Sequence, residues 1–197
     1  IVSYVGGTGN DVTLRCTKDA TTTVVSSSVN PSVYGQPVSF TAVVTGVAVG
    51  APIPTGTVQF EIDGAPFGAP VALDAAGSAT SGSINSLSVT PPAPLHTVTA
   101  TYSGAAAFLG STGTLPGDQT VNPADTTTTV ASSSNPSVYG ETVTFTATVA
   151  AVAPGGYIPS GDVTFTIDGV VQPVVALDGA GQATASISTL AVGGPYV

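Results

Sequence analysis

The chain has 197 residues, a length that suits about two small domains. Only 2 Lys and Arg stand against 11 Asp and Glu, the formal net charge is -9, and no Lys or Arg follows Lys18. Binding to nucleic acid and to anionic lipid headgroups depends on basic side chains, so this composition argues against both partners. No run of about 18 apolar residues occurs, so no membrane insertion is expected.

Residues 1–19 are predicted to be the terminal hairpin of a preceding domain. Two short apolar runs, 2–5 and 12–14, lie on either side of the turn G-G-T-G-N-D at 6–11. This turn also fits the start of a calcium-binding nonapeptide repeat, with Asp11 as a ligand. Such sites need several stacked copies to enclose the ion. One copy is present, which favours a plain Gly-rich turn.

The next hundred residues show the period-two alternation of apolar and polar residues that is typical of half-buried strands. Asp63-Gly64 fits a two-residue hairpin turn of type I′, which needs positive φ at both positions. Seven short strands separated by turns predict an immunoglobulin-like sandwich over residues 20–122. The strands are expected near 21–27, 37–45, 57–62, 70–74, 78–84, 96–103 and 112–121.

The chain then repeats itself at an offset of 105 residues. The segment N-P-S-V-Y-G at 30–35 returns unchanged at 135–140. Residues 123–125 are interpreted as a linker and 126–197 as a second, incomplete domain. The predicted fold class is therefore all-β, with tandem immunoglobulin-like β-sandwiches, the second lacking its last two strands in this chain. Such a sandwich would have open edges, so we expect either a continuing chain or another chain to supply strands.

The repeated pieces, taken together, resemble the bacterial Ig-like repeats of large secreted and cell-surface proteins. The pieces are 21–25, 30–38, 54–60 and 96–104, and the second repeat has counterparts of all but the last. The resemblance implies a seven-stranded sandwich used as a spacer, stalk or fibre element. It carries no catalytic residues to this chain. Residues 1–14 look like the closing segment of repeat regions that precede such domains.

Few side chains could support chemistry, and we predict no catalytic residue and no cofactor. Asp63 and Asp74 lie at turns, where Asp commonly accepts hydrogen bonds from its own backbone. The alternative is a loop calcium ion, for which Asp11, Asp63 and Asp74 are weak candidates. His96 is the only histidine. It has no partner nearby in the sequence and is interpreted as structural.

Tyr34 and Tyr139 recur at the same place in the two repeats, each before a glycine. The expected role is core or corner packing, with the phenol hydroxyl bonded to the backbone. The alternative is a platform on which sugars stack. The chain has no Trp, which weakens a carbohydrate-binding interpretation.

These features predict a non-catalytic structural repeat of an extracellular stalk or filament, secreted or at the cell surface. Edge strands are commonly protected from pairing by lysines, and the repeats contain none. The expected partners are other copies of the chain or neighbouring domains of the same protein, with residues 1–14 as the donated strand. The alternative is an adhesin or a glycan-binding module, which would need a surface cluster of aromatic and polar residues.

Overall fold

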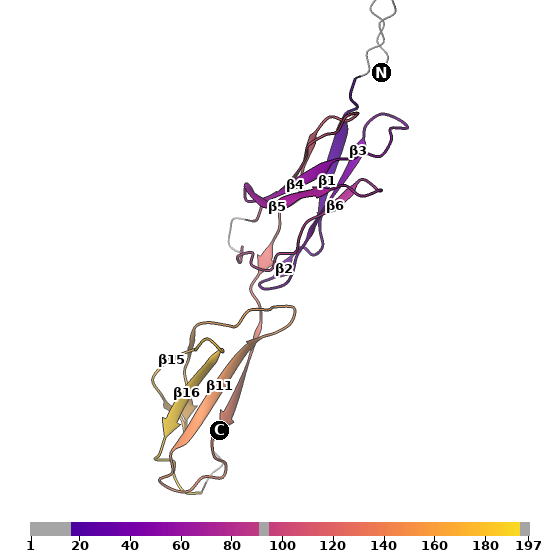
Figure 1. Cartoon of the computed structure of the whole chain (residues 1–197). Helices are drawn as coiled ribbons and strands as arrows, with labels where there is room; N and C mark the ends of the chain where they lie inside the picture. The colour runs from indigo at the N-terminus through magenta and orange to yellow at the C-terminus, as the bar shows by residue number, and fades with distance from the viewer. Residues whose placement is uncertain (1–16, 91–94, 194–197) are drawn as a thin grey trace, which may run out of the picture. The chain divides into compact units, whose positions relative to one another are not determined.

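The structure is a computed structural model that describes residues 17–90 and 95–193 (Figure 1). Asp11, a weak calcium candidate, and the predicted donor strand at 1–14 lie outside these ranges. All regular elements in the described ranges are β-strands, and none of these residues forms a helix that could cross a membrane. The chain divides into two compact units, one with residues up to Ser32 and Pro37–Asn122, the other with Val33–Gln36 and Pro123–Val197.

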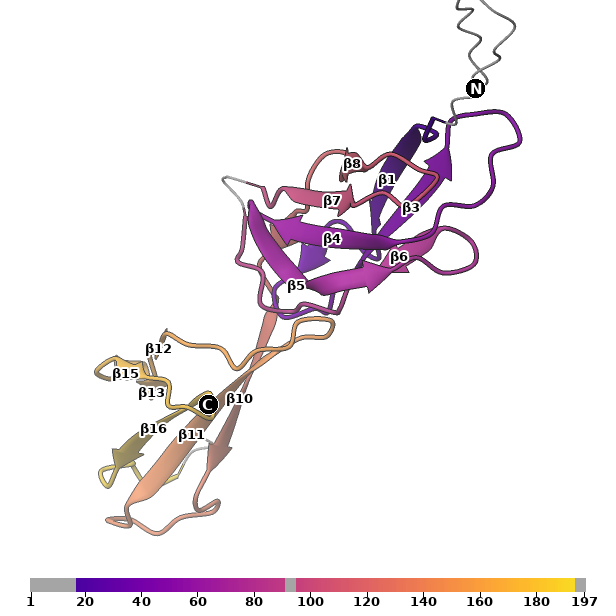
Figure 2. The same cartoon turned by 45° about the horizontal axis from the view of Figure 1, so that its top comes forward.

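The first repeat has a three-stranded and a four-stranded sheet, in the orders β1-β3-β6 and β5-β4-β7-β8, and a short β2-β9 pair (Figure 2). The strands are β1 (Thr21–Ser27), β2 (Ser32–Val33), β3 (Phe40–Gly46), β4 (Thr57–Ile62), β5 (Ala65–Ala72), β6 (Ser78–Thr80), β7 (Val98–Tyr102), β8 (Ser111–Thr114) and β9 (Val121–Asn122).

One face of each sheet of the first repeat is buried, as the period-two pattern predicts. On β3 the side chains of Phe40, Ala42 and Val44 are buried, while Thr41 and Val43 between them are not. The same alternation occurs on β4 and β7. These faces form one continuous apolar core, to which Val25 of β1, Leu115 after β8 and Val121 of β9 also belong.

The second repeat keeps the three-stranded sheet, in the order β10-β11-β16, but replaces the larger sheet by two-residue pairs, β12-β15 and β13-β14. Its described residues include no counterpart of β7, β8 or β9. The strands are β10 (Thr126–Ser132), β11 (Val143–Ala151), β12 (Asp162–Val163), β13 (Thr166–Ile167), β14 (Val170–Val171), β15 (Val175–Ala176) and β16 (Gln182–Ile187).

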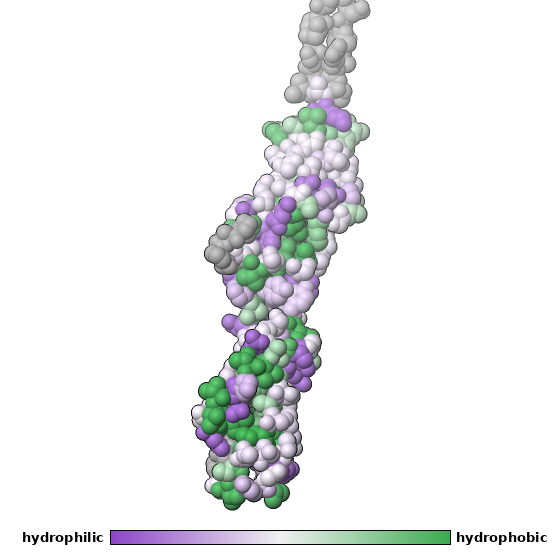
Figure 3. Space-filling model, turned by 90° about the vertical axis from the view of Figure 1, so that its left-hand side faces the viewer, coloured by the Kyte–Doolittle hydropathy of each residue, from purple (hydrophilic) through white to green (hydrophobic). Residues whose placement is uncertain are grey.

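The core of the second repeat is smaller and divided into two clusters. Val143, Ile167 and Leu190 form one cluster, and Ala147, Phe165 and Ala183 form the other. Every residue of β10 is exposed, whereas its counterpart β1 buries two side chains. Apolar side chains therefore remain on the surface of this repeat (green in Figure 3).

The predicted strands at 21–27 and 57–62 are confirmed with the same bounds. Asp63 and Gly64 both have positive φ, of 52° and 76°, as the predicted hairpin turn requires. The strand expected at 70–74 begins earlier, at Ala65. It lies at the edge of its sheet, where prolines are tolerated and the alternation of apolar residues is lost.

Candidate functional site

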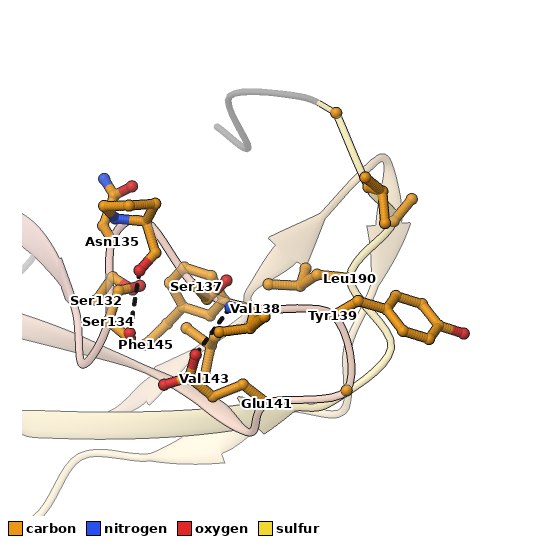
Figure 4. Close-up of a pocket in the computed structure, with 15 residues that line it drawn as sticks. Ser132, Ser134, Asn135, Ser137, Val138, Tyr139, Glu141, Val143, Phe145 and Leu190 are labelled. Carbon is orange, nitrogen blue, oxygen red and sulfur yellow. Dashed lines mark hydrogen bonds between the residues drawn. The ribbon is translucent and has the colours of Figure 1, made fainter.

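The second repeat has a groove of about 460 Å³ at the end where its turn 134–141 meets the beginning of β11 (Figure 4). Its polar wall is formed by Ser132, Asn135 and Ser137. Its apolar floor includes Val143 and Leu190, which are both buried. The groove therefore joins hydrogen-bonding groups to an apolar surface.

Local hydrogen bonds fix the turn that forms the wall. The Ser132 hydroxyl donates to the Ser134 carbonyl oxygen at 2.9 Å, and the Val138 amide donates to a Glu141 carboxylate oxygen at 2.9 Å (Figure 4). The Glu141 amide donates in return to the Val138 carbonyl oxygen at 2.9 Å. The wall is therefore shaped by its own sequence and needs no other segment to hold it.

The first repeat forms the same turn from the corresponding residues. The Ser27 hydroxyl oxygen lies 2.9 Å from the Val29 carbonyl oxygen, and the Val33 amide donates to the Gln36 side-chain oxygen at 2.9 Å. The Asn-Pro peptide bond is cis in both repeats. The two turns differ in their surroundings. Ser32 is buried, whereas its counterpart Ser137 is exposed.

In the first repeat the fully buried side chain of Gln119 lies against the turn and contacts Ser32. Its amide group donates to the Val29 carbonyl oxygen at 3.0 Å and to the Ser32 hydroxyl at 3.2 Å. Its oxygen accepts from the Ser27 hydroxyl at 2.7 Å. All polar atoms of this buried side chain are thus paired, as a stable core requires.

Asn30 binds the backbone on both sides of Gln119. Its amide group donates to the Asp118 carbonyl oxygen at 2.7 Å, and its oxygen accepts from the Thr120 amide at 3.0 Å. The Ser32 amide also donates to the Thr120 carbonyl oxygen at 3.0 Å. Together Asn30, Ser32 and Ser27 hold one extended segment by its backbone and one glutamine by its side chain.

The predicted core packing of the two recurring tyrosines is wrong, although the Tyr34 ring lies against the Tyr157 ring, with 5.0 Å between the ring centroids. Tyr34 and Tyr139 are both exposed, and the Tyr139 ring, at 76% exposure, points away from the other labelled side chains (Figure 4). The buried tyrosine of the first repeat is Tyr102, whose hydroxyl donates to the Thr55 carbonyl oxygen at 2.5 Å. Tyr102 lies on β7. Tyr34 and Tyr139 each precede a glycine with positive φ, which marks a turn rather than a strand.

The weak calcium candidates in the first repeat bind their surroundings as turn residues do. One Asp74 oxygen accepts from the amides of Ala76 and Ser78, at 2.8 and 2.9 Å. Asp63 accepts from the Thr97 amide at 3.0 Å and contacts His96. Nowhere in the described ranges do three or more His, Cys, Asp or Glu side chains gather as a metal site would need. Calcium binding by Asp63 or Asp74 stays the weaker alternative to their role as turn residues.

His96 does have partners, which the sequence did not reveal because they lie far away along the chain. Its Nδ1 atom is 2.7 Å from an Asp63 carboxylate oxygen. Its Nε2 atom is 3.1 Å from the carbonyl oxygen of Ser88 and 3.3 Å from the Ser88 hydroxyl. Asp63 is 33 residues from His96 in the sequence, and Ser88 is 8 residues from it. The pairing of β4 with β7 brings Asp63 and His96 together.

This Ser88–His96–Asp63 arrangement has the order of a hydrolytic triad, but its geometry favours a structural tether. The nearer neighbour of Nε2 is the Ser88 carbonyl oxygen, at 3.1 Å, rather than the Ser88 hydroxyl, at 3.3 Å, which is the group that a serine nucleophile would present. His96 therefore ties the β4–β5 hairpin to the segment before β7.

These two repeats are immunoglobulin-like β-sandwiches. The family model of the bacterial Ig-like domain (group 3) matches residues 22–122 and 127–196. The chain belongs to this family, and the resemblance seen in the sequence is confirmed. Domains of this kind are typically structural modules.

Among solved structures, the chain is similar to a crystal structure of the N-terminal eight Ig domains of Down Syndrome Cell Adhesion Molecule, isoform 1.30.30. The two are 16% identical, with a TM-score of 0.32, and the match covers 86% of this chain and 23% of that one. This chain thus spans about a quarter of the length of that structure. No curated protein is significantly similar to the chain.

Proposed function

We propose that the chain is a non-catalytic structural segment of an extracellular surface stalk or filament, which pairs strands with neighbouring chains. One observation carries the proposal. Among the described residues, β10 and a groove beside it are exposed in the second repeat, whereas in the first repeat β1 packs against β8 and Ser27 contacts Gln119. An immunoglobulin-like sandwich in this state has a surface suited to receive a strand.

The open edge of the second repeat is β10. It pairs with β11 on one side only, and its sequence T-T-T-T-V-A-S is uncharged and rich in residues that favour strands. Soluble proteins commonly place lysine or inward-pointing charge on such an edge to prevent pairing. No lysine or arginine occurs anywhere after Lys18. The edge therefore lacks the usual protection against another strand.

Sedimentation of the whole chain over about two decades of concentration tests this proposal. We expect the average mass to rise with concentration. The variant Thr127→Lys, which places a charge on β10, should stay monomeric. Its matched control Thr22→Lys, at the corresponding exposed position of β1, should associate like the unchanged chain. A chain that is monomeric throughout, or association that Thr127→Lys does not reduce, would contradict strand pairing.

An adhesin or glycan-binding role is the second candidate, and it rests on Tyr139. This ring is the most exposed tyrosine of the chain's described residues, at 76%, and it lies beside the groove. An exposed aromatic ring is a surface on which sugar rings can stack. Binding of the chain to a panel of immobilised glycans, lost in Tyr139→Ala and kept in Tyr34→Ala, would favour this role over the structural one.

A further inference from the structure

We infer that β16 is a second interaction surface of the chain, and that its partner is β16 of another copy, paired antiparallel. β16 is the outer strand of the sheet β10-β11-β16, on the side of β11 away from β10 (Figure 2). Its counterpart in the first repeat, β6, is likewise the outer strand of its own sheet. The edge is therefore a property of the fold that both repeats share. The inference goes beyond the proposed function, which concerns the opposite edge, β10.

The first repeat protects this edge, whereas the second repeat does not. β6 has three residues and β16 has six. Just after β6, the amide of Ser81 donates to the Phe40 carbonyl oxygen at 2.8 Å. The next bonded pair is Val38 with Ile84, so two residues, 82–83, lie opposite one residue of the other strand. This is a β-bulge, which bends an edge strand and interrupts its ladder. β16 pairs with β11 over all six of its residues.

Two residues of β16 direct their backbone groups towards the free edge. The Gly181 carbonyl oxygen accepts from an amide of β11 at 2.9 Å, so every second residue from Gly181 faces β11. Gln182 faces the other way, and its amide and carbonyl are bonded to Asp178 at 2.9 and 2.8 Å. Thr184 and Ser186 follow in the same orientation, and no strand of the described residues pairs with them on that side. The edge thus offers two amides and two carbonyls to an incoming strand.

The sequence of β16 is self-complementary in one antiparallel register. When Ala185 of one copy lies opposite Ala185 of the other, Thr184 lies opposite Ser186 in both directions. The two amides and two carbonyls of each copy are then all paired. Centring the contact on Thr184 or Ser186 instead would place one of them opposite Gln182 or Ser188. The backbone of Gln182 is already bonded and Ser188 lies outside β16, so half of the bonds would be lost. The contact is therefore isologous, with its two-fold axis at Ala185.

The side chains also fit this register. On the outer face, the exposed hydroxyls of Thr184 and of Ser186 from the other copy come together. Thr144 and Ser186 already form such a cross-strand pair within the sheet, with 2.8 Å between their hydroxyl oxygens. On the inner face, Ala183 of one copy lies opposite Ile187 of the other, so an apolar residue meets an apolar residue. Cross-strand pairs of these kinds stabilise antiparallel sheets.

The edge can also be approached by another negatively charged copy. The chain has a net charge of -9, yet no charged residue occurs at 179–193. The acid that precedes β16 is Asp178, seven residues before Ala185, so its two copies would lie roughly 45 Å apart. This separation far exceeds the screening length of about 8 Å at physiological salt. Like-charge repulsion at the edge therefore does not oppose the pairing.

The contact is expected to be weak by itself. Six residues a side bury far less than the roughly 1,200–2,000 Å² of stable interfaces. A chain whose β10 edge is blocked therefore stays monomeric in sedimentation, and β16 acts where chains are already held close together. Because β10 and β16 are opposite edges of one sheet, a chain that uses both has two neighbours. Assembly can then continue instead of ending at a pair.

Disulfide trapping of the whole chain tests the inference, because a residue on a two-fold axis lies opposite its own copy. The two Ala185 residues would form a pair without hydrogen bonds between them, with Cα atoms about 4.5 Å apart. A disulfide spans about 4.4–6.8 Å between Cα atoms. The native cysteine is first replaced, as Cys16→Ser. Ala185→Cys, oxidised mildly at about 1 mM chain so that weak contacts are populated, should form a covalent dimer.

Gln182→Cys is the control for chance collisions. Gln182 is more exposed than Ala185, but in this register its two copies would lie roughly 20 Å apart. It should therefore give little covalent dimer. The comparison separates a defined contact from random oxidation, because random oxidation would favour the more exposed position.

Variants of the edge show whether the dimer depends on strand pairing. Thr184→Lys places a charge on the edge and should abolish the Ala185→Cys dimer. Thr80→Lys, at the corresponding exposed position of β6, is the matched control and should leave the dimer unchanged. Thr184→Pro removes an amide that faces the free edge and should also abolish the dimer, because proline is tolerated on edge strands. Amide hydrogen exchange of β11 shows whether each variant keeps its own sheet.

Three results would overturn the inference: no covalent dimer from Ala185→Cys, as much dimer from Gln182→Cys, or a dimer that survives both changes at Thr184. The proposed function is tested separately by Thr127→Lys, and Ala185→Cys should still form its dimer in that background. A chain that associates through β10 but forms no such dimer keeps the proposed function and loses this inference. A chain that is monomeric in sedimentation but forms the dimer does the reverse.

Discussion

Val25 and Val130 occupy the same position in the two repeats, yet Val25 is 2% exposed and Val130 is 61% exposed. Both lie on the first strand of their repeat, paired with the corresponding residues of the next strand, Ala42 and Ala147. The difference arises from what covers that strand. In the first repeat β8 and the segment after it lie beside β1, and the described part of the second repeat has no such cover.

Alanine at these two positions should therefore have unequal effects. Val25→Ala is expected to destabilise the first repeat by about 2 kcal/mol, from lost burial and the cavity left behind. Val130→Ala should change the second repeat by less than about 0.5 kcal/mol. Hydrogen exchange of the β3 and β11 amides measures each repeat separately. Equal losses would mean that Val130 is covered in solution.

Gln119 is expected to be the most costly polar side chain to remove from the first repeat. Gln119→Ala removes a fully buried side chain and its hydrogen bonds to Ser27, Val29 and Ser32, and we expect a loss of roughly 3 kcal/mol. Urea unfolding followed by circular dichroism measures it. Gln182→Ala, at an exposed position on β16, is the control and should be nearly neutral. A small effect at Gln119 would show that water replaces the amide.

Gly113 lies where β8 approaches β1 most closely. A methyl group there would overlap the carbonyl oxygen of Thr23, whereas one at Gly82 would meet nothing within 4 Å. Gly113→Ala is therefore expected to cost about 2 kcal/mol or more, and Gly82→Ala should be close to neutral. Thermal unfolding of the two variants compares them directly. A stable Gly113→Ala variant would contradict the close approach of the two strands.

Tyr102 should make the first repeat sensitive to alkali. Burial raises the pKa of the Tyr102 hydroxyl above its ordinary value of 10.0. As the pH rises past 10, the unfolded chain loses this proton while the folded chain keeps it. The contribution of Tyr102 to stability is thus fully present below pH 10 and is lost as the pH rises through the raised pKa.

The measurement is the free energy of unfolding of the first repeat at several pH values between about 8 and 11. The control is Tyr102→Phe, which removes the titrating group. It also loses the bond to Thr55, so we expect it to be about 1 kcal/mol less stable at neutral pH. Its stability should fall less steeply above pH 10. Parallel curves for the two proteins would assign the alkaline sensitivity to another group.

The sequence predicted the strands that alternate regularly and the turns with strict backbone requirements. Thr57–Ile62 follows from alternation alone, and Asp63-Gly64 from the need for positive φ. Such features depend on neighbours in the chain, so a local pattern reveals them. The start of β5 at Ala65 was not predicted. An edge strand pairs with only one neighbouring strand, so its sequence shows less of the alternation by which a strand is predicted.

The functional features were harder to predict because each depends on residues that lie far apart along the chain. Nothing near Gln119 marks it as buried. Its partners Ser27 and Ser32 lie 92 and 87 residues earlier. His96 and Asp63 meet in the same way.

The order of the polar contacts in the first repeat determines how it would respond to tension. The partners of Thr21, Ser27 and Ser32 are Ser111, Gln119 and Thr120, so the two segments run parallel. Stretching the chain from its ends would pull these segments past each other lengthwise, and the bonds would be strained together rather than one at a time.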